Sequence, residues 1–314
     1  TLYWVASGAV TGHLVQIDIS YENGLSWFLL ASNIPANVST LRWDTTTWFT
    51  QPYVRWRVQS MSDPSVSDMA DTWFTIRNSN IVYYVNDSNT VGDIYTVNPG
   101  GFGGGNGLTT NTPMEHLDDL LRTYDLEAGD RVYVDTGIYV PTQQLTYIGY
   151  ADSGAGAGLV NILGSTNSSQ GGTRIIGAGL TIEGANGLSV QDMEFEGVVS
   201  RPGLIFAAAV SNVQLEAIGA RGVVGVGMRA LRSRGAIFTR CSVLGATTNG
   251  LHDDNSYGTV WQNGLLWSNV NAVQASGREG AGQLAVSNSI LVGYGSAQTI
   301  YRYQDTGAFT SDYN

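Results

Sequence analysis

Residues 188–197 read Leu-Ser-Val-Gln-Asp-Met-Glu-Phe-Glu-Gly, and the same pattern of apolar and polar positions returns four more times along the chain. The later copies occupy 213–222, 236–245, 259–268 and 284–293. Their anchor residues, separated by 25, 23, 23 and 25 residues, are Val190, Leu215, Phe238, Trp261 and Val286. A period of roughly 20–50 residues indicates stacked repeats that bury their apolar faces against one another.

Aligning the five copies separates apolar columns from polar ones. The mostly apolar columns lie two residues before the anchor (Leu188, Val213, Ala236, Thr259, Leu284), three after it (Met193, Ile218, Cys241, Gly264, Ser289) and five after it (Phe195, Ala220, Val243, Leu266, Leu291). Successive side chains of a strand point to opposite faces, so these columns predict the interior of a parallel β-helix. Cys241 is expected to be buried there. Asn263 and Asn288, aligned two residues after the anchor, predict stacked amides at a turn.

Composition limits the possible functions. The chain has 314 residues, a net charge of −11, 40 glycines and one cysteine, and all 15 of its basic residues are arginine. Lysine chemistry, including Schiff bases and the phosphate-binding lysine, is therefore excluded. An acidic chain without a basic run is a poor partner for nucleic acid, and no apolar stretch reaches the roughly 18 residues of a membrane helix. No spacing of cysteine and histidine predicts a metal site, and we expect no cofactor.

The first 78 residues predict a separate antiparallel domain. Segments 13–21, 53–59 and 72–76 alternate apolar and polar residues and are separated by turn sequences. This short span also holds four tryptophans, Trp27, Trp43, Trp56 and Trp73. They fit the core and sheet faces of a β-sandwich, with a sugar-stacking platform as the alternative.

A family resemblance covers nearly all of this domain. Residues 17–27, the strand at 53–58 and the segment 63–68 before Phe74 resemble the immunoglobulin-like or fibronectin type III-like modules of large bacterial surface proteins. Such modules are spacers in that family. The resemblance therefore implies presentation of a neighbouring domain rather than chemistry.

Residues 79–129 form a glycine-rich linker followed by a predicted helix. Thr112-Pro113-Met114-Glu115 is a capping box with proline at the first helical position, so the helix is expected to start there. The helix, Gly129-Asp130 and the strand before Gly137 resemble the N-terminal cap and first turn of right-handed parallel β-helix proteins of the pectate-lyase-like superfold.

The most enzyme-like string is 250–256, which contains His252, Asp253 and Asp254. Two carboxylates with different environments serve as acid and base in glycoside hydrolysis, and Arg232 is a candidate base for a lyase. Adjacent residues of a strand point to opposite faces, however, so the two aspartates converge only if the chain bends. The string is also an ordinary turn of a β-helix, and we assign no catalytic residue beyond these weak candidates.

The outward columns change character along the repeat. Glu196 and Arg221 fall on adjacent copies and predict a surface ion pair. Further on, the same outward positions hold Leu265, Trp267, Ile290 and Val292. An exposed apolar patch of this kind marks an interaction site, covered by the tail from Tyr294 onward, by another copy or by another module.

Together these patterns predict an all-β protein. We expect an Ig-like β-sandwich at 1–78, a linker and capping helix at 79–129, and a right-handed single-stranded parallel β-helix at 130–314. The function that fits best is an extracellular structural or adhesive module of a bacterial cell-surface or filament protein. Its expected partners are copies of itself or adjacent modules, with polysaccharide as a further candidate. The alternatives are a β-helix polysaccharide lyase or glycoside hydrolase and a noncatalytic carbohydrate-binding module.

Overall fold

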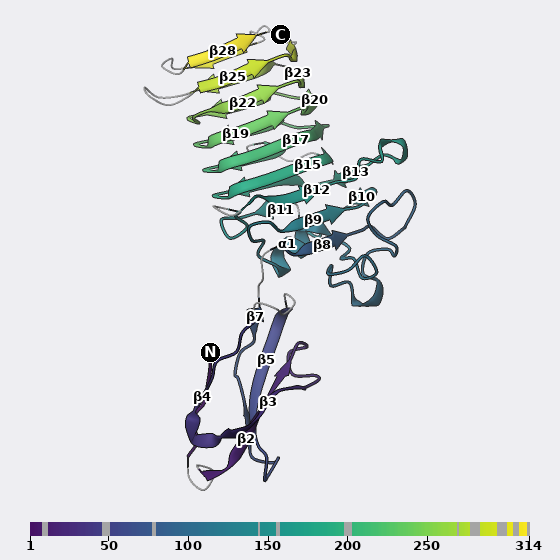
Figure 1. The fold of residues 1–314 in the computed structure, drawn as a ribbon. Coiled ribbons are helices and arrows are strands. Elements are labelled where there is room, and N and C mark those ends of the chain that lie inside the picture. Colours follow the sequence, from purple (N-terminus) through teal and green to yellow (C-terminus); the bar gives the residue numbers. More distant parts are fainter. Residues whose placement is uncertain are drawn as a thin grey trace. The chain divides into compact units, whose positions relative to one another are not determined.

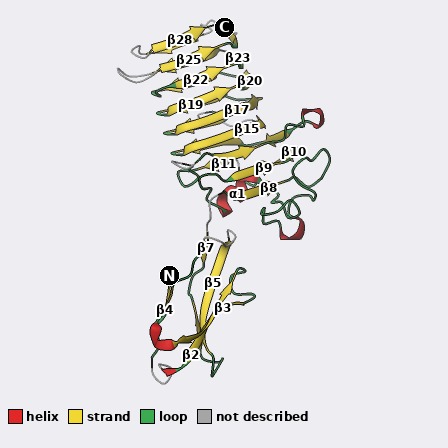
Figure 2. Ribbon diagram, viewed as in Figure 1, coloured by secondary structure: helices red, strands yellow, loops and turns green. Residues whose placement is uncertain are grey.

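Strands dominate both parts of the chain (Figures 1 and 2). The computed structural model describes residues 1–7, 12–45, 51–76, 80–143, 145–154, 158–197, 203–268, 270–276, 283–293, 300–303 and 308–312. The chain falls into two units, Thr1–Asn78 and Ser79–Asn314, which are described separately below.

The first unit is built from antiparallel strands. Its larger sheet has the order β3-β2-β5-β6, with β7 paired to β5, and a second ribbon joins β1 to β4. Leu2 and Trp4 from the ribbon segment share one apolar cluster with Val15 and Ile17 of β2, an arrangement compatible with a β-sandwich. The elements are β1 Leu2–Tyr3, β2 Leu14–Ser20, β3 Phe28–Pro35, the 3₁₀ turn Ala36–Val38, β4 Thr40–Leu41, β5 Gln51–Ser60, β6 Ser67–Met69 and β7 Phe74–Ile76.

The second unit is a parallel β-helix, as the repeat predicts. One face has the strand order β28-β25-β22-β19-β17-β15-β12-β9-β8 (Figure 1). Another face has the order β11-β14-β16-β18-β21-β24-β27. A third face links β10 to β13 and continues through the later halves of β15 and β17 to β20, β23 and β26. In the second unit as a whole, the strands that precede the repeat are β8 Val82–Val85, β9 Arg131–Val134, β10 Gly137–Tyr139, β11 Leu145–Ile148, β12 Val160–Leu163, β13 Thr173–Ile176 and β14 Gly179–Glu183.

The repeat itself supplies the remaining strands. They are β15 Asn186–Glu196, β16 Ile205–Ala208, β17 Ser211–Arg221, β18 Met228–Leu231, β19 Arg234–Thr239, β20 Ser242–Ala246, β21 Asn249–Asp254, β22 Thr259–Gln262, β23 Leu265–Ser268, β24 Asn271–Ser276, β25 Gln283–Ser287, β26 Ile290–Gly293, β27 Ile300–Tyr303 and β28 Ala308–Asp312. The strand partners confirm the alignment, since Val190 pairs with Leu215, Leu215 with Phe238, and Trp261 with Val286. All five anchor side chains and Cys241 are buried in one continuous core.

Each repeat bends at the position two residues after its anchor. All five residues there have a left-handed backbone, with φ between 45° and 56°: Asp192, Ala217, Arg240, Asn263 and Asn288. Asparagine tolerates this conformation better than most residues. The Asn288 side chain donates to Asn263 Oδ1 at 2.6 Å, which confirms the predicted stacking of amides.

The capping helix starts later than the capping box predicts. α1 spans Leu117–Thr123, and its N-cap residue His116 makes no side-chain capping bond. Met114 is instead drawn into an extended pairing with Val85, donating to Tyr84 O and accepting from Asn86 N. Thr112 donates its hydroxyl to Asn106 Oδ1. Tertiary pairing thus overrides the local helix signal, while Leu117, Leu120 and Leu121 still bury against the end of the β-helix core.

Candidate functional site

The structure separates the candidate catalytic residues. Arg229, His252 and Gln274 are strand partners on the outer side of the face formed by β18, β21 and β24. Asp253 lies in the opposite column between Ala230 and Ala275 and is 3 % exposed. β21 is regular through Asp254, so the two adjacent carboxylates point to opposite sides of the strand. The paired acid and base required for glycoside hydrolysis is not formed by these residues.

Asp253 is an interior carboxyl group. The Thr259 hydroxyl donates to Asp253 Oδ1 at 3.1 Å. Burial raises the pKa of Asp253 to about 6, and its hydrogen bonds with Ser256 and Thr259 offset only part of that rise. The carboxyl group is therefore largely ionised at neutral pH inside an apolar environment, at a cost to the folded state.

Asp254 and His252 form a small polar cluster on the outside. Arg229 Nη2 lies 2.7 Å from Asp254 Oδ2, and Ser276 Oγ lies 3.2 Å from both Asp254 Oδ1 and His252 Nε2. Burial raises the pKa of Asp254, but the hydrogen bond from Arg229 and the neighbouring positive charges bring it below its usual value. Burial and the Arg229 charge lower the pKa of His252 to about 4. At neutral pH the cluster thus contains a neutral imidazole and an ionised carboxylate already paired with arginine.

This cluster does not form a hydrolytic triad. In a triad the carboxylate orients the imidazole, whereas Asp254 contacts the Ser276 hydroxyl. At neutral pH Asp254 is an ionised carboxylate and His252 is a neutral imidazole rather than an imidazolium, so neither is a strong general acid. Arg232 occupies an exposed corner with φ of 49°, and Arg229 takes the ion-pairing position instead. Among the candidate arginines of 228–234 the sequence did not single out Arg229 as the partner of Asp254, and it gave no sign of Ser276, although both lie about one repeat away from His252 and Asp254.

Replacing Asp253 by asparagine is expected to stabilise the β-helix at neutral pH. The native pKa of about 6 exceeds the ordinary value of 3.8, so this carboxyl group weakens folding progressively as pH rises from about 4 to above 6. A shift of about two units corresponds to about 3 kcal/mol. Asp253→Asn keeps an acceptor for Thr259, and we expect a gain of up to about 3 kcal/mol at pH 7.5 that vanishes near pH 4.

The matched control is Asp254→Asn, the same change on the outer side of the same strand. It removes the charge opposite Arg229, so it is expected to lower stability at pH 7.5. Urea unfolding of each variant, followed by circular dichroism at both pH values, measures the difference. A loss of stability in Asp253→Asn at pH 7.5 would contradict the burial of an ionised carboxylate.

The predicted apolar residues do meet on one surface. β23 pairs with β26, which places Leu265 beside Ile290 and Trp267 beside Val292 on the outer side. Trp267 is 44 % exposed and Ile290 is 64 % exposed. We call these four residues the assembly surface. Their inward neighbours Leu266 and Leu291 pack into or against the core.

The described part of the tail joins other faces of the β-helix. β27 pairs with β24 and β28 pairs with β25, so these strands extend the stack rather than fold onto β26. The predicted cover also includes residues 294–299, 304–307 and 313–314, which lie outside the described residues. Exposed apolar side chains such as Trp267 and Ile290 are typical of an interaction site.

The same outward columns carry charge nearer the N-terminus of the β-helix. Arg174 Nη2 lies 2.5 Å from Glu196 Oε2, and Arg221 Nε lies 2.9 Å from Glu194 Oε2. The predicted ion pair between Glu196 and Arg221 is therefore wrong, although the two are strand neighbours. Arg174 reaches Glu196 from β13 on its other side, which leaves Arg221 to pair diagonally with Glu194. These partly exposed pairs contribute little stability.

A polar groove of about 480 Å³ runs beside these pairs, between segment 165–173 and the bends of β15 and β17. Arg221 and Arg240 both line it, and both pair with a glutamate, since Arg240 Nη2 lies 2.8 Å from Glu216 Oε1. Asp192 also lines the groove, and burial raises its pKa. Because its arginines are already neutralised, the groove is poorly suited to an acidic sugar.

Among the described residues, no group of three or more histidine, cysteine, aspartate or glutamate side chains is placed to hold a metal ion. No helix in the same part of the chain is long and apolar enough to cross a membrane.

Comparison of the chain with protein-family models, with curated proteins and with solved structures finds no match.

Proposed function

We propose that this chain is a structural module that associates side by side with a second copy through the assembly surface. The observation that supports the proposal is the pair of exposed apolar side chains, Trp267 and Ile290, on adjacent strands of a rigid stack. Monomeric proteins seldom leave contiguous apolar surface facing water without a use for it. The enzyme alternative loses its main support because Asp253 is turned into the core.

A second copy is the partner that fits the surface best. Neighbouring strands of any β-helix repeat at about 4.8 Å, so two copies present side-chain rows of the same spacing. In a two-fold arrangement the apolar rows meet each other, and each residue of the patch faces a residue of the same patch. The assembly surface itself carries no charged side chain, so no buried charge opposes this contact.

The setting we propose is the outside of a bacterial cell, in a surface or filament protein. The resemblance of residues 1–78 to spacer modules supports this, as does the absence of lysine together with the low share of charged residues, 13 %. In this account the first unit presents the β-helix, and the β-helix makes the lateral contact. Adjacent modules of the same large protein would offer rows of side chains equivalent to those of a second copy.

Self-association is expected to strengthen with salt. Each chain carries a net charge of −11, so two copies repel one another, and salt shortens the range of that repulsion from about 10 Å at 0.1 M to about 3 Å at 1 M. Apolar contact is not weakened by the same change. Sedimentation velocity at both salt concentrations measures the dimer fraction. A monomer at every concentration and salt level would overturn the proposal.

A further inference from the structure

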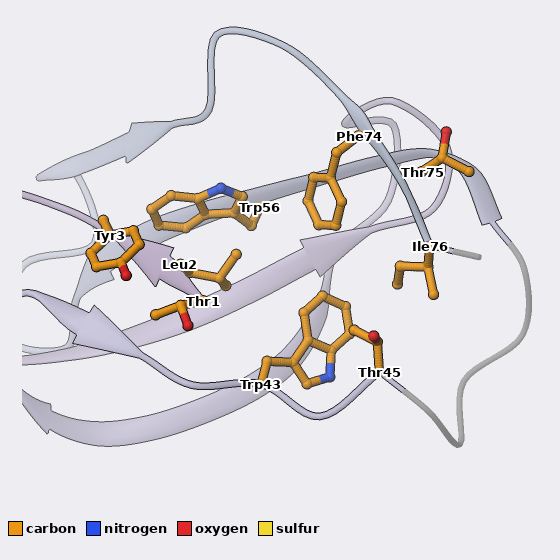
Figure 3. Close-up of a pocket in the computed structure, with 9 residues that line it drawn as sticks. All are labelled: Thr1, Leu2, Tyr3, Trp43, Thr45, Trp56, Phe74, Thr75 and Ile76. Atoms are coloured by element: carbon orange, nitrogen blue, oxygen red, sulfur yellow. The ribbon is translucent and has the colours of Figure 1, made fainter. Parts of the chain in front are cut away.

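The first unit contains a hollow between its two sheets (Figure 3). Its volume is about 710 Å³, and it is lined by β1, the segment after β4, the middle of β5 and β7. The hollow is open to solvent, and its volume is within the range of ligand pockets, about 300–1,000 Å³.

Aromatic rings supply most of the apolar wall. Figure 3 shows Trp56 and Phe74 on one side and Trp43 across from them. Trp43 and Phe74 pack edge to face, with ring centroids 6.4 Å apart and planes at 83°. All three rings also pack against the buried core, which holds them in place. Because the rings are fixed before any ligand arrives, little conformational entropy is lost on binding.

The side chains of the remaining lining are polar and uncharged, and Thr1 adds its α-amino group. Thr45, Thr75 and Tyr3 bring hydroxyl groups, and none of the described residues that line the hollow has a carboxylate, guanidinium or imidazole group. No side chain of this wall compensates a phosphate or carboxylate that leaves water. The wall matches a neutral molecule with apolar faces and hydroxyl edges.

We infer that this hollow binds a neutral sugar ring. A pyranose presents C–H groups on its face, which stack on indole and phenyl rings, and hydroxyl groups at its edge, which hydrogen-bond to threonine and tyrosine hydroxyls. The site lies wholly within the first unit and is separate from the assembly surface of the second. Sugar binding and self-association are therefore independent properties, and either can fail without the other.

Isothermal titration of the full chain with soluble neutral oligosaccharides of glucose, mannose, xylose and N-acetylglucosamine tests the inference. We expect at least one to bind, with tryptophan fluorescence changing in parallel, while oligogalacturonate does not bind. Thr45→Trp fills the hollow from its rim and is expected to weaken binding by about tenfold or more, which is about 1.4 kcal/mol. Trp56→Ala removes a stacking ring and is expected to weaken binding as well.

The matched control is Trp73→Ala, which removes an exposed tryptophan outside the lining and is expected to leave binding unchanged. Circular dichroism establishes whether each variant is folded. If Trp56→Ala does not fold, Thr45→Trp alone tests the inference. Three results would overturn the inference: no neutral oligosaccharide bound by the folded chain, equal binding by Thr45→Trp, or preferential binding of oligogalacturonate.

Discussion

Replacing Trp261 by alanine is expected to lower the free energy of unfolding of the β-helix by about 3–5 kcal/mol. Trp261 is fully buried, and its ring centroid lies 5.8 Å from that of Phe238 on the preceding repeat. Gly264 makes room for the indole, because a Cβ at that position would lie 2.6 Å from the ring. A stacked core cannot close over the space left by the indole without displacing neighbouring strands, so a cavity remains.

The next tryptophan along the chain provides the control. Trp267→Ala makes the same chemical change six residues later, on the outer side of β23, and is expected to alter stability far less. Denaturant unfolding followed by circular dichroism in the far ultraviolet measures both variants. Equal losses of stability would contradict the assignment of Trp261 to the interior and Trp267 to the surface.

Replacing Trp267 by glutamate is expected to abolish most self-association. Trp267 lies beside Val292 in the assembly surface, and a large aromatic residue in such a contact commonly contributes 2 kcal/mol or more. Glutamate removes that apolar area and brings in a carboxylate that must lose water without a partner. We expect the dissociation constant to rise by at least about 30-fold, equivalent to about 2 kcal/mol. Sedimentation velocity measures it.

Tyr257→Glu separates the effect of the surface from that of charge. Tyr257 is an exposed aromatic residue in the turn between β21 and β22, outside the assembly surface, and its replacement adds the same negative charge. It is expected to leave association nearly unchanged. A similar weakening in both variants would attribute the effect to net charge, and no weakening in Trp267→Glu would remove this surface from the contact.

The β-helix could be predicted because its signal is repeated. One apolar position proves little, but Val190, Leu215 and Phe238 at matching offsets fix the strand register, and the structure pairs them as aligned. The bend was foreseeable only in part. Asn263 and Asn288 indicated a turn, whereas Ala217 has the same left-handed backbone without any local signal for it. Its conformation follows from the stacking of neighbouring repeats.

The start of the helix, the ion pairs and the polar cluster could not be predicted, because each depends on a partner that is distant in sequence. Met114 leaves the predicted helix because it pairs with Val85. Glu196 binds Arg174, which lies one repeat earlier, rather than Arg221, which lies one repeat later. The outer cluster around His252 required Ser276, which only the register of β24 against β21 brings within reach. Each of these contacts is set by tertiary packing, which local patterns do not encode.

The most direct test of the assembly surface is covalent crosslinking between copies. Cys241 is buried, and burial raises the pKa of its thiol to about 12, so it does not interfere. Ile290→Cys places a reactive thiol in the assembly surface. Ile138→Cys places one in the same outward column at the other end, where the side chain is 53 % exposed.

Each variant is treated at low concentration with a short bismaleimide and resolved by denaturing electrophoresis. The account predicts that Ile290→Cys is converted to a covalent dimer while Ile138→Cys remains a monomer. Equal crosslinking of the two variants, or none of Ile290→Cys, would contradict a contact between copies through Leu265, Trp267, Ile290 and Val292.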